Sequence, residues 1–252
     1  MQFRRTTAQP PASYWSTMDR RAFLKALPAL AAVAVTTRAV AQSSTAGGQS
    51  ADALEPILLP PPAADGGKSV LAALWERRTI RSIASRPLPK QMLSNLLFAA
   101  WGVNRENGPG GRVGRTAASA SNSQEIDLYV VLPNGAYLYQ AVPHRLSPVA
   151  VGDHRAAVGG ARGSDNPATA PVILLLVADL ARYNSDRSED PAQMDSPTQQ
   201  SYYNVAAGLI AGNVYLFAAS QGLAAWLHTV SYTHLRAHET PEHLVCRLLL
   251  EK

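Results

Sequence analysis

The sequence predicts an α+β domain in which helices flank a central mixed or antiparallel sheet. Two apolar runs, Asp127–Leu132 and Ala136–Gln140, are separated by an Asn-Gly turn signal that is typical of an antiparallel hairpin. The run Pro171–Ala178 is short and almost wholly aliphatic, which favours a strand buried on both faces in the middle of a sheet. The longest helical pattern, Tyr202–Gln221, supplies the main helix of the domain.

The first 41 residues are expected to be an export signal. Asp19–Lys25 contains twin arginines, the apolar run Ala26–Val35 follows, and Ala39–Ala41 offers small residues for cleavage. Charged, apolar and small-residue regions in this order are typical of a signal peptide, and the twin arginines match the twin-arginine type. We therefore expect recognition by the twin-arginine export machinery, cleavage after Ala41 and a periplasmic protein. Met18 directly precedes the signal and is a candidate for the true start.

The segments after the signal are expected to be a tether and then one domain. Residues 42–65 are rich in Ser, Ala, Gly and Pro, so we expect an extended tether without a core of its own, followed by a domain over 66–229. Apolar periodicity predicts helices over Val70–Arg78 and Lys90–Trp101. Asn104–Gly114 holds four glycines and a proline, which predicts a mobile loop.

The candidate binding segment Arg77-Arg78-Thr79-Ile80-Arg81-Ser82 stands at the end of the first predicted helix. It places three guanidinium groups and two hydroxyl groups within six residues. Arginine forms bidentate, charge-assisted bonds with phosphate oxygens, and a threonine hydroxyl adds a neutral donor. This composition indicates a phosphate site. The alternative is a solvated basic helix end, because most basic runs lie on the surface.

A second candidate segment, Arg115–Gln124, is a polar loop of small residues that leads into a predicted strand. Such a backbone approaches a flat ligand closely and offers amide and hydroxyl groups to it. Together the two segments resemble the nitroreductase family of FMN-dependent oxidoreductases, in which an RRSxR element binds the flavin phosphate and a PSxxNxQ loop meets the flavin of the partner subunit. The matching residues are Arg77, Arg78, Thr79 and Arg81 in the first element and Ala118, Ser119, Ala120, Asn122 and Gln124 in the second. Ala118 replaces the usual proline.

The resemblance extends from Gly66 to about His228 and includes Gly208–Leu216 and the turn at Gly222-Leu223. It implies a nitroreductase-like fold and a homodimer with FMN held between the subunits. Hydride or electron-pair transfer between a donor and a small organic substrate would follow a ping-pong scheme, with nitroaromatics, quinones, enones and azolines as suitable substrates. The stretch Trp101–Arg105 resembles the branch of the family that includes azoline oxidases.

The resemblance also implies a role for each matching residue. The arginines and Thr79 would hold the flavin phosphate and ribityl chain, and the loop residues would touch the flavin across the dimer. No residue stands out as a general acid or base. Because export removes the protein from the nicotinamide pool, we expect a physiological reductant other than NAD(P)H. Two alternatives stay open: a non-enzymatic periplasmic flavin or ligand carrier, and a tethered interaction domain without a cofactor.

The last segment, 230–252, resembles translated read-through of a sequencing-library adaptor rather than a protein segment. It contains the single cysteine, Cys246, and three of the six histidines, so we discount a His/Cys metal site and expect no metal in the domain. We expect this tail to lie loosely outside the sheet and the closing part of the family fold to be missing. Part of the formal charge of +5 comes from the tail and the signal, so the charge does not indicate nucleic-acid binding.

Overall fold

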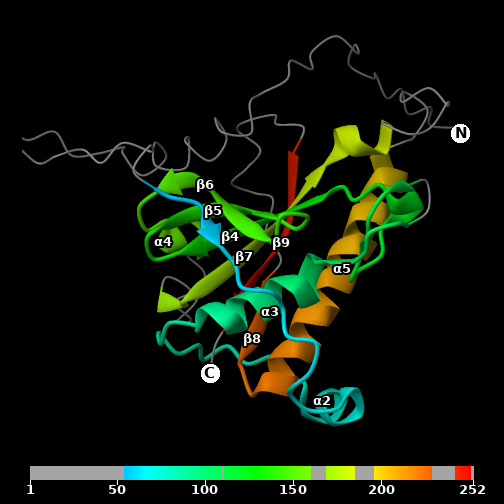
Figure 1. The fold of residues 1–252 in the computed structure, drawn as a ribbon. Helices are drawn as coiled ribbons and strands as arrows, with labels where there is room; N and C mark the ends of the chain where they lie inside the picture. The colour runs from blue at the N-terminus through cyan, green and yellow to red at the C-terminus, as the bar shows by residue number, and fades with distance from the viewer. Residues whose placement is uncertain (1–53, 109–110, 160–168, 185–195, 229–241, 251–252) are drawn as a thin grey trace, which may run out of the picture.

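The computed structural model describes residues 54–108, 111–159, 169–184, 196–228 and 242–250; the expected signal peptide lies outside them. A seven-stranded antiparallel sheet in the order β1-β6-β5-β4-β7-β9-β8 forms the centre (Figure 1), and the α+β prediction is confirmed. The sheet strands are β1 Ile57–Leu58, β4 Ile126–Leu132, β5 Gly135–Gln140, β6 Arg145–Val151, β7 Val172–Asp179, β8 Ala225–His228 and β9 Glu242–Leu250. The helices are α2 Val70–Glu76, α3 Lys90–Trp101, α4 Arg155–Gly159 and α5 Ser196–Gln221.

The predicted hairpin and the predicted buried strand form the middle of the sheet. β4 pairs with β5 across the Asn-Gly turn and with β7 along its other edge, and every residue of β7 is buried. The neighbouring strand β6 was not predicted. Its centre holds Pro148, which cannot donate to a ladder, and the β5–β6 register shifts beside that proline.

Two helices cover one face of the sheet and enclose the main core. Leu96 and Leu97 of α3 and Ile210 and Val214 of α5 are wholly buried against that face, together with Leu128 of β4. α5 begins at Ser196, before the predicted helical pattern at Tyr202, and 185–195 lie outside the described residues. No helix among the described residues has the length and apolar character needed to cross a bilayer.

The described part of the expected tether is docked on the domain. β1 pairs with β6, and Leu59 is buried. Side chains of α3 hold the proline-rich segment that follows: Ser94 Oγ donates to Pro60 O (2.6 Å), Gln91 Nε2 donates to Pro61 O (2.9 Å), and Asn95 Oδ1 accepts from Ala63 N (2.8 Å). Composition alone misleads here, because proline carbonyls are strong acceptors that a polar helix face can satisfy. The expectation of a tether without its own packing is wrong for 54–63.

The tail also differs from expectation over Glu242–Leu250. These residues form β9, which pairs with β7 on one side and β8 on the other. The prediction that they stay outside the sheet is therefore wrong. Its physical reason is that the edge of β7 presents a row of unpaired backbone groups, which an apolar extended segment satisfies largely irrespective of its side chains.

Candidate functional site

The arginine segment leaves the end of α2 as an extended strip along β8. Ser69 caps α2 by accepting from Ala72 N, and Arg77 ends the helix. Ile80 N then donates to Ala225 O of β8 at 3.0 Å. This single backbone bond sets the strip beside β8, so its side chains project from the rim of the domain.

The three guanidinium groups of the strip are exposed, and none forms an ion pair with a described residue. Arg77 lies 5.5 Å from the Tyr215 ring centroid, and Arg81 lies 5.8 Å from that of Trp226. The neighbouring Glu76 is engaged by Lys68 instead. Aromatic faces attract the guanidinium groups without neutralising them. The positive charge of the strip is therefore not neutralised by a described residue, and this favours binding of an anion.

Thr79 completes the strip with a positioned hydroxyl. Its Oγ1 lies 3.2 Å from the Tyr215 hydroxyl, which accepts from Leu227 N at 2.8 Å. Tyr215 thus connects α5, β8 and the strip. All four residues predicted to hold a phosphate, Arg77, Arg78, Thr79 and Arg81, lie on this one exposed strip.

The second segment is a tightly bonded turn. Ala120–Asn122 forms the short 3₁₀ helix η4, and Ser121, Asn122 and Gln124 have φ values of 52°, 53° and 52°. Non-glycine residues rarely adopt this left-handed region, so the surrounding bonds must hold the turn. Of the residues predicted to touch a flavin, Ala118 is exposed and Ser119, Ala120 and Asn122 are half-buried.

Hydrogen bonds from its own residues and its neighbours fix this turn. Gln124 N donates to Ser119 Oγ (2.9 Å), Gln124 Nε2 donates to Val113 O (2.8 Å) and to Asn122 Oδ1 (3.1 Å), and Arg112 Nη1 donates to Asn122 O (3.1 Å). Arg115 Nε donates to Gln124 Oε1 at 2.7 Å. Preceding residues form the small hairpin β2 Val103–Arg105 and β3 Gly114–Arg115. The prediction of a mobile loop over Asn104–Gly114 is therefore wrong at both ends of that run.

The two predicted segments lie on different sides of α5. Asn213 Nδ2 donates to Thr116 O of the turn (3.2 Å), whereas Tyr215 contacts Thr79 of the arginine strip. Residues two apart on a helix point in nearly opposite directions. Figure 1 likewise shows the loops before β4 beside the upper part of α5 and α2 at its lower end. One chain does not bring the two segments onto one ligand.

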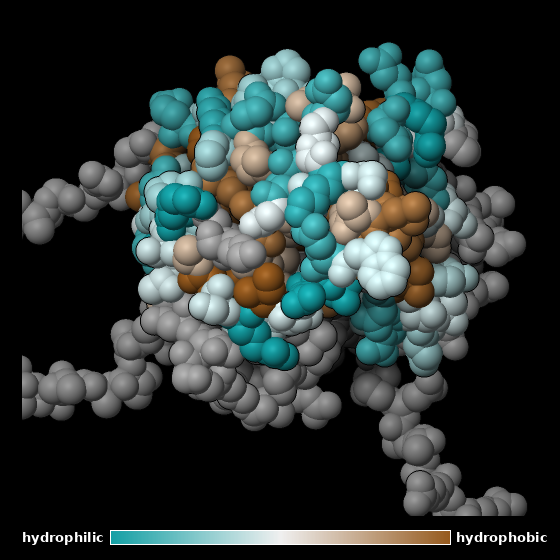
Figure 2. Space-filling model, turned by 90° about the horizontal axis from the view of Figure 1, so that it is seen from below, coloured by the Kyte–Doolittle hydropathy of each residue, from teal (hydrophilic) through white to brown (hydrophobic). Residues whose placement is uncertain are grey.

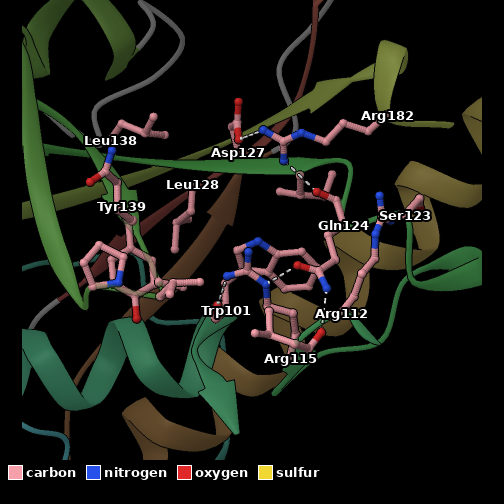
Figure 3. Close-up of a pocket in the computed structure, with 16 residues that line it drawn as sticks. Trp101, Arg112, Arg115, Ser123, Gln124, Asp127, Leu128, Leu138, Tyr139 and Arg182 are labelled. Carbon is pink, nitrogen blue, oxygen red and sulfur yellow. Dashed lines mark hydrogen bonds and ion pairs between the residues drawn. The ribbon is translucent and has the colours of Figure 1, made fainter. Parts of the chain in front are cut away.

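A pocket of about 450 Å³ opens beside the turn (Figure 3). Leu138 and Tyr139 of β5 form one side, Trp101 and Arg115 another, and Gln124 lies between them and Arg182. Sequence reasoning missed this pocket, because its residues come from separate elements. One residue could have indicated a polar site here: Asp127 is the one acidic residue inside the otherwise apolar strand β4.

Arg182 lies at the rim of this pocket and links two aspartates by ion pairs. It forms ion pairs with Asp127 and with Asp179, 3.3 Å away, and its Nη1 donates to Gln124 O at 2.6 Å. Both aspartates are 8% exposed. Buried carboxylates need such a partner, so Arg182 ties the start of β4 to the end of β7.

A hydrogen-bond chain runs from the pocket wall to the docked N-terminal segment. The Tyr139 hydroxyl lies 2.9 Å from His144 Nδ1, His144 Nε2 lies 2.7 Å from Ser94 Oγ, and Ser94 donates to Pro60 O. Because Ser94 uses its proton on Pro60, His144 donates from Nε2 and accepts from Tyr139 at Nδ1. Burial lowers the pKa of His144. His144 is therefore a member of an internal hydrogen-bond chain.

A buried acid lies behind the turn. Glu125 is fully buried, and its Oε2 accepts from Ser123 Oγ at 2.6 Å, while its Oε1 has no hydrogen-bond partner among the described residues. Burial, and then the nearby Glu125, raise the pKa of Tyr183. Glu125 does not line the pocket, so it supports the turn from inside.

Comparison with known proteins identifies the fold and the family. The Nitroreductase family profile matches residues 74–240, which is more than half of the chain. The chain belongs to the nitroreductase family. This family consists of flavin oxidoreductases, and the resemblance of the two predicted segments to it is confirmed at that level.

Individual nitroreductase relatives agree with this assignment. "Putative nitroreductase MJ1384" of Methanocaldococcus jannaschii is 30% identical over 158 residues, which cover 60% of this chain and 73% of that protein. The crystal structure of a putative nitroreductase from Ralstonia eutropha JMP134 superposes with a TM-score of 0.63 at 32% identity, over 78% of this chain and 89% of the other. Nitroreductase A from Vibrio parahaemolyticus, at 18% identity and a TM-score of 0.50 over 73% of this chain and 67% of the other, shares the fold.

Proposed function

We propose that this nitroreductase-family oxidoreductase binds FMN and transfers electron pairs between a donor and a small organic substrate in two alternating half-reactions. The arginine strip carries the proposal. Three exposed guanidinium groups and the Thr79 hydroxyl lie within five residues there, without a carboxylate partner among the described residues. A doubly charged phosphate suits such a cluster, because each arginine adds a charge-assisted bond.

Bound FMN would supply the redox chemistry, and the protein would supply position and shielding. Arg77, Arg78 and Arg81 would hold the phosphate, and Thr79 would donate to it. The turn residues Ser119, Ala120 and Asn122 would meet the ring system from the other subunit. The left-handed backbone of that turn is held in place before any ligand arrives, which limits the entropy lost on binding.

We further propose a homodimer. The strip and the turn lie on different sides of α5, so a second copy is needed to bring one chain's turn to the other chain's strip. α2 presents an apolar surface, on which Leu71 is 72% exposed and Trp75 is 87% exposed, and α5 adds Val205 and Leu209. Figure 2 shows brown apolar residues in several groups among polar ones on the side of the domain seen from below. Exposed apolar patches of this kind typically mark protein interfaces.

The glycines of α5 support the same proposal. Gly208 and Gly212 are exposed, and a Cβ added at either would meet no atom within 4 Å. Packing inside this chain therefore gives no reason for glycine at these positions. Close approach of a partner helix does give one, because small residues let two helix backbones come together.

The location and the electron donor follow from the N-terminal sequence alone. The twin-arginine pattern supports export to the periplasm with the cofactor already inserted. A quinol, a carrier protein or the organic substrate itself would then supply electrons in place of NAD(P)H. Stopped-flow reduction by NADPH on the anaerobic protein tests this, and fast reduction would contradict the proposal.

A flavin titration tests the central proposal. We expect the full chain to bind FMN with a stoichiometry of one per subunit, and Leu71→Glu to lower both the dimer fraction in light scattering and the FMN affinity. A chain that takes up no FMN contradicts the proposal. The non-enzymatic carrier is recognised by a different result: FMN binds, but its reduced form is not reoxidised by nitroaromatics or quinones faster than free reduced FMN is.

A further inference from the structure

The pocket beside the turn contains a half-buried arginine, Arg115, whose charge no described carboxylate neutralises by direct contact. Arg115 Nε donates to Gln124 Oε1 (2.7 Å), and Nη1 donates to Trp101 O (3.0 Å). Both acceptors are neutral, and Nη2 has no hydrogen-bond partner among the described residues. The guanidinium also lies over the Trp101 ring, 5.1 Å from its centroid. An unneutralised guanidinium in a partly desolvated pocket favours an incoming anion.

Of the other arginines that line the pocket, Arg182 is paired with Asp127 and Asp179, and Arg112 donates to the neutral carbonyl of Asn122. The lining therefore favours a negative charge beside Arg115. A planar carboxylate supplies a single negative charge and matches the guanidinium fork.

The rest of the pocket wall favours an apolar body on that carboxylate. Leu128, Leu138 and Tyr139 line the side away from Arg115 (Figure 3), and the Tyr139 hydroxyl is already bonded to His144. The remaining amide in this region, Gln140, accepts from Arg145. A volume of about 450 Å³ is within the usual range for small-molecule sites.

We propose that this pocket is a second ligand site, separate from the arginine strip, which binds a small flat carboxylate through Arg115. Its aromatic or aliphatic ring lies against Leu128, Leu138 and Tyr139. The site depends on residues of one chain and does not require bound FMN. Burial, which lowers the pKa of Arg115, is in keeping with a guanidinium that gains from an anionic partner.

Calorimetric titration of the full chain with benzoate tests the proposal, with neutral benzamide as the matched control. We expect saturable binding of benzoate and at least about tenfold weaker binding of benzamide, since a charge-assisted bond is lost. Arg115→Gln should weaken benzoate binding by about tenfold or more, and the matched substitution Arg105→Gln, on the exposed strand β2, should not.

Two further variants place the bound benzoate. Val142, an exposed residue at the pocket, can be enlarged without disturbing the core, so Val142→Trp should block binding while leaving Arg115 intact. Arg81→Ala should leave benzoate binding unchanged, with or without FMN. Equal binding of benzamide, insensitivity to Val142→Trp, or dependence on Arg81 or on FMN would each overturn the proposal. If Arg115→Gln does not fold, the Val142→Trp result decides.

Discussion

Arg81 and Arg115 both lie against a tryptophan ring, yet their surroundings differ in every other respect. Arg81 lies 5.8 Å from the Trp226 ring centroid, is exposed and forms no hydrogen bond or ion pair with a described residue. Arg115 lies 5.1 Å from that of Trp101, is half-buried and donates two hydrogen bonds to neutral acceptors. Arg81 belongs to a strip held by one backbone bond, whereas Arg115 belongs to a turn fixed by many.

This difference predicts that the strip governs ligand affinity and that the turn governs the stability of the fold. Residues of the strip are expected to affect what the protein binds and hardly its folding, because their charges pair with no carboxylate among the described residues. Residues around the turn are expected to affect folding first, because their bonds hold left-handed backbone and buried acids. Four predictions test this distinction.

The largest effect is expected for Arg182→Ala. It leaves Asp127 and Asp179, both buried, without their cation, and breaking such a buried pair typically costs about 3–5 kcal/mol. Urea unfolding followed by circular dichroism measures the loss. The exposed Arg105→Ala is the control and should change the free energy of unfolding by less than about 0.5 kcal/mol. Similar values for the two variants would show that Arg182 is not the clamp of β4 and β7.

The next effect concerns FMN binding by the strip. Arg78→Ala or Arg81→Ala should weaken FMN binding by about 1.5–3 kcal/mol, or roughly one to two decades, because one charge-assisted bond to the phosphate is lost. The free energy of unfolding without FMN should stay within about 0.5 kcal/mol of the parent value. Flavin fluorescence titration checks the first expectation. Unchanged affinity in both variants would place the phosphate elsewhere.

A smaller effect is expected for Gln124→Ala, which removes the side chain that links Arg115, Val113 and Asn122. We expect a loss of about 1–2 kcal/mol in the free energy of unfolding, since these bonds are partly exposed and not additive. The exposed Gln200→Ala provides the matched control. FMN affinity should fall as well if the turn meets the flavin of the partner. Reduced affinity without reduced stability would assign Gln124 to the ligand alone.

The sequence predicted those parts of the fold whose signal is local. Lys90–Trp101 is a helix with the predicted ends, because its apolar period is regular and Gly102 follows it. The Asn-Gly turn likewise defines the β4–β5 hairpin. α5 starts six residues before its predicted start at Tyr202, since its first turns are polar and carry no apolar period. β6 was missed for a similar reason, because Pro148 at its centre is a residue that favours loops.

The candidate site divides along the same line. The strip and the turn are contiguous in sequence, so their residues could be named in advance. The chain from Tyr139 through His144 and Ser94 to Pro60 could not, because His144 and Ser94 are 50 residues apart and Ser94 looks like any polar residue of a helix. The same holds for the pocket, because α3, β4, β5 and the segment after β7 join β3 and the turn in lining it. The adaptor origin of 230–252 stays a prediction, which the genomic locus can test.

The smallest effect is expected from lowering the pH, which should reduce the stability of the folded protein through His144. Burial lowers the pKa of His144 below its ordinary value of 6.5, so the folded protein binds a proton less readily than the unfolded chain. Stability should therefore fall as pH drops through about 6.5, because the unfolded state gains the proton first. The measurement is the urea midpoint at about pH 7.5 and about pH 5.5 for the parent and for His144→Gln, whose amide can still donate to Ser94 but does not titrate.

The parent should lose more stability than the variant between the two pH values. An equal loss in both would mean that His144 is protonated in the folded state as readily as in the unfolded one, and that the chain from Tyr139 to Pro60 does not depend on the neutral imidazole.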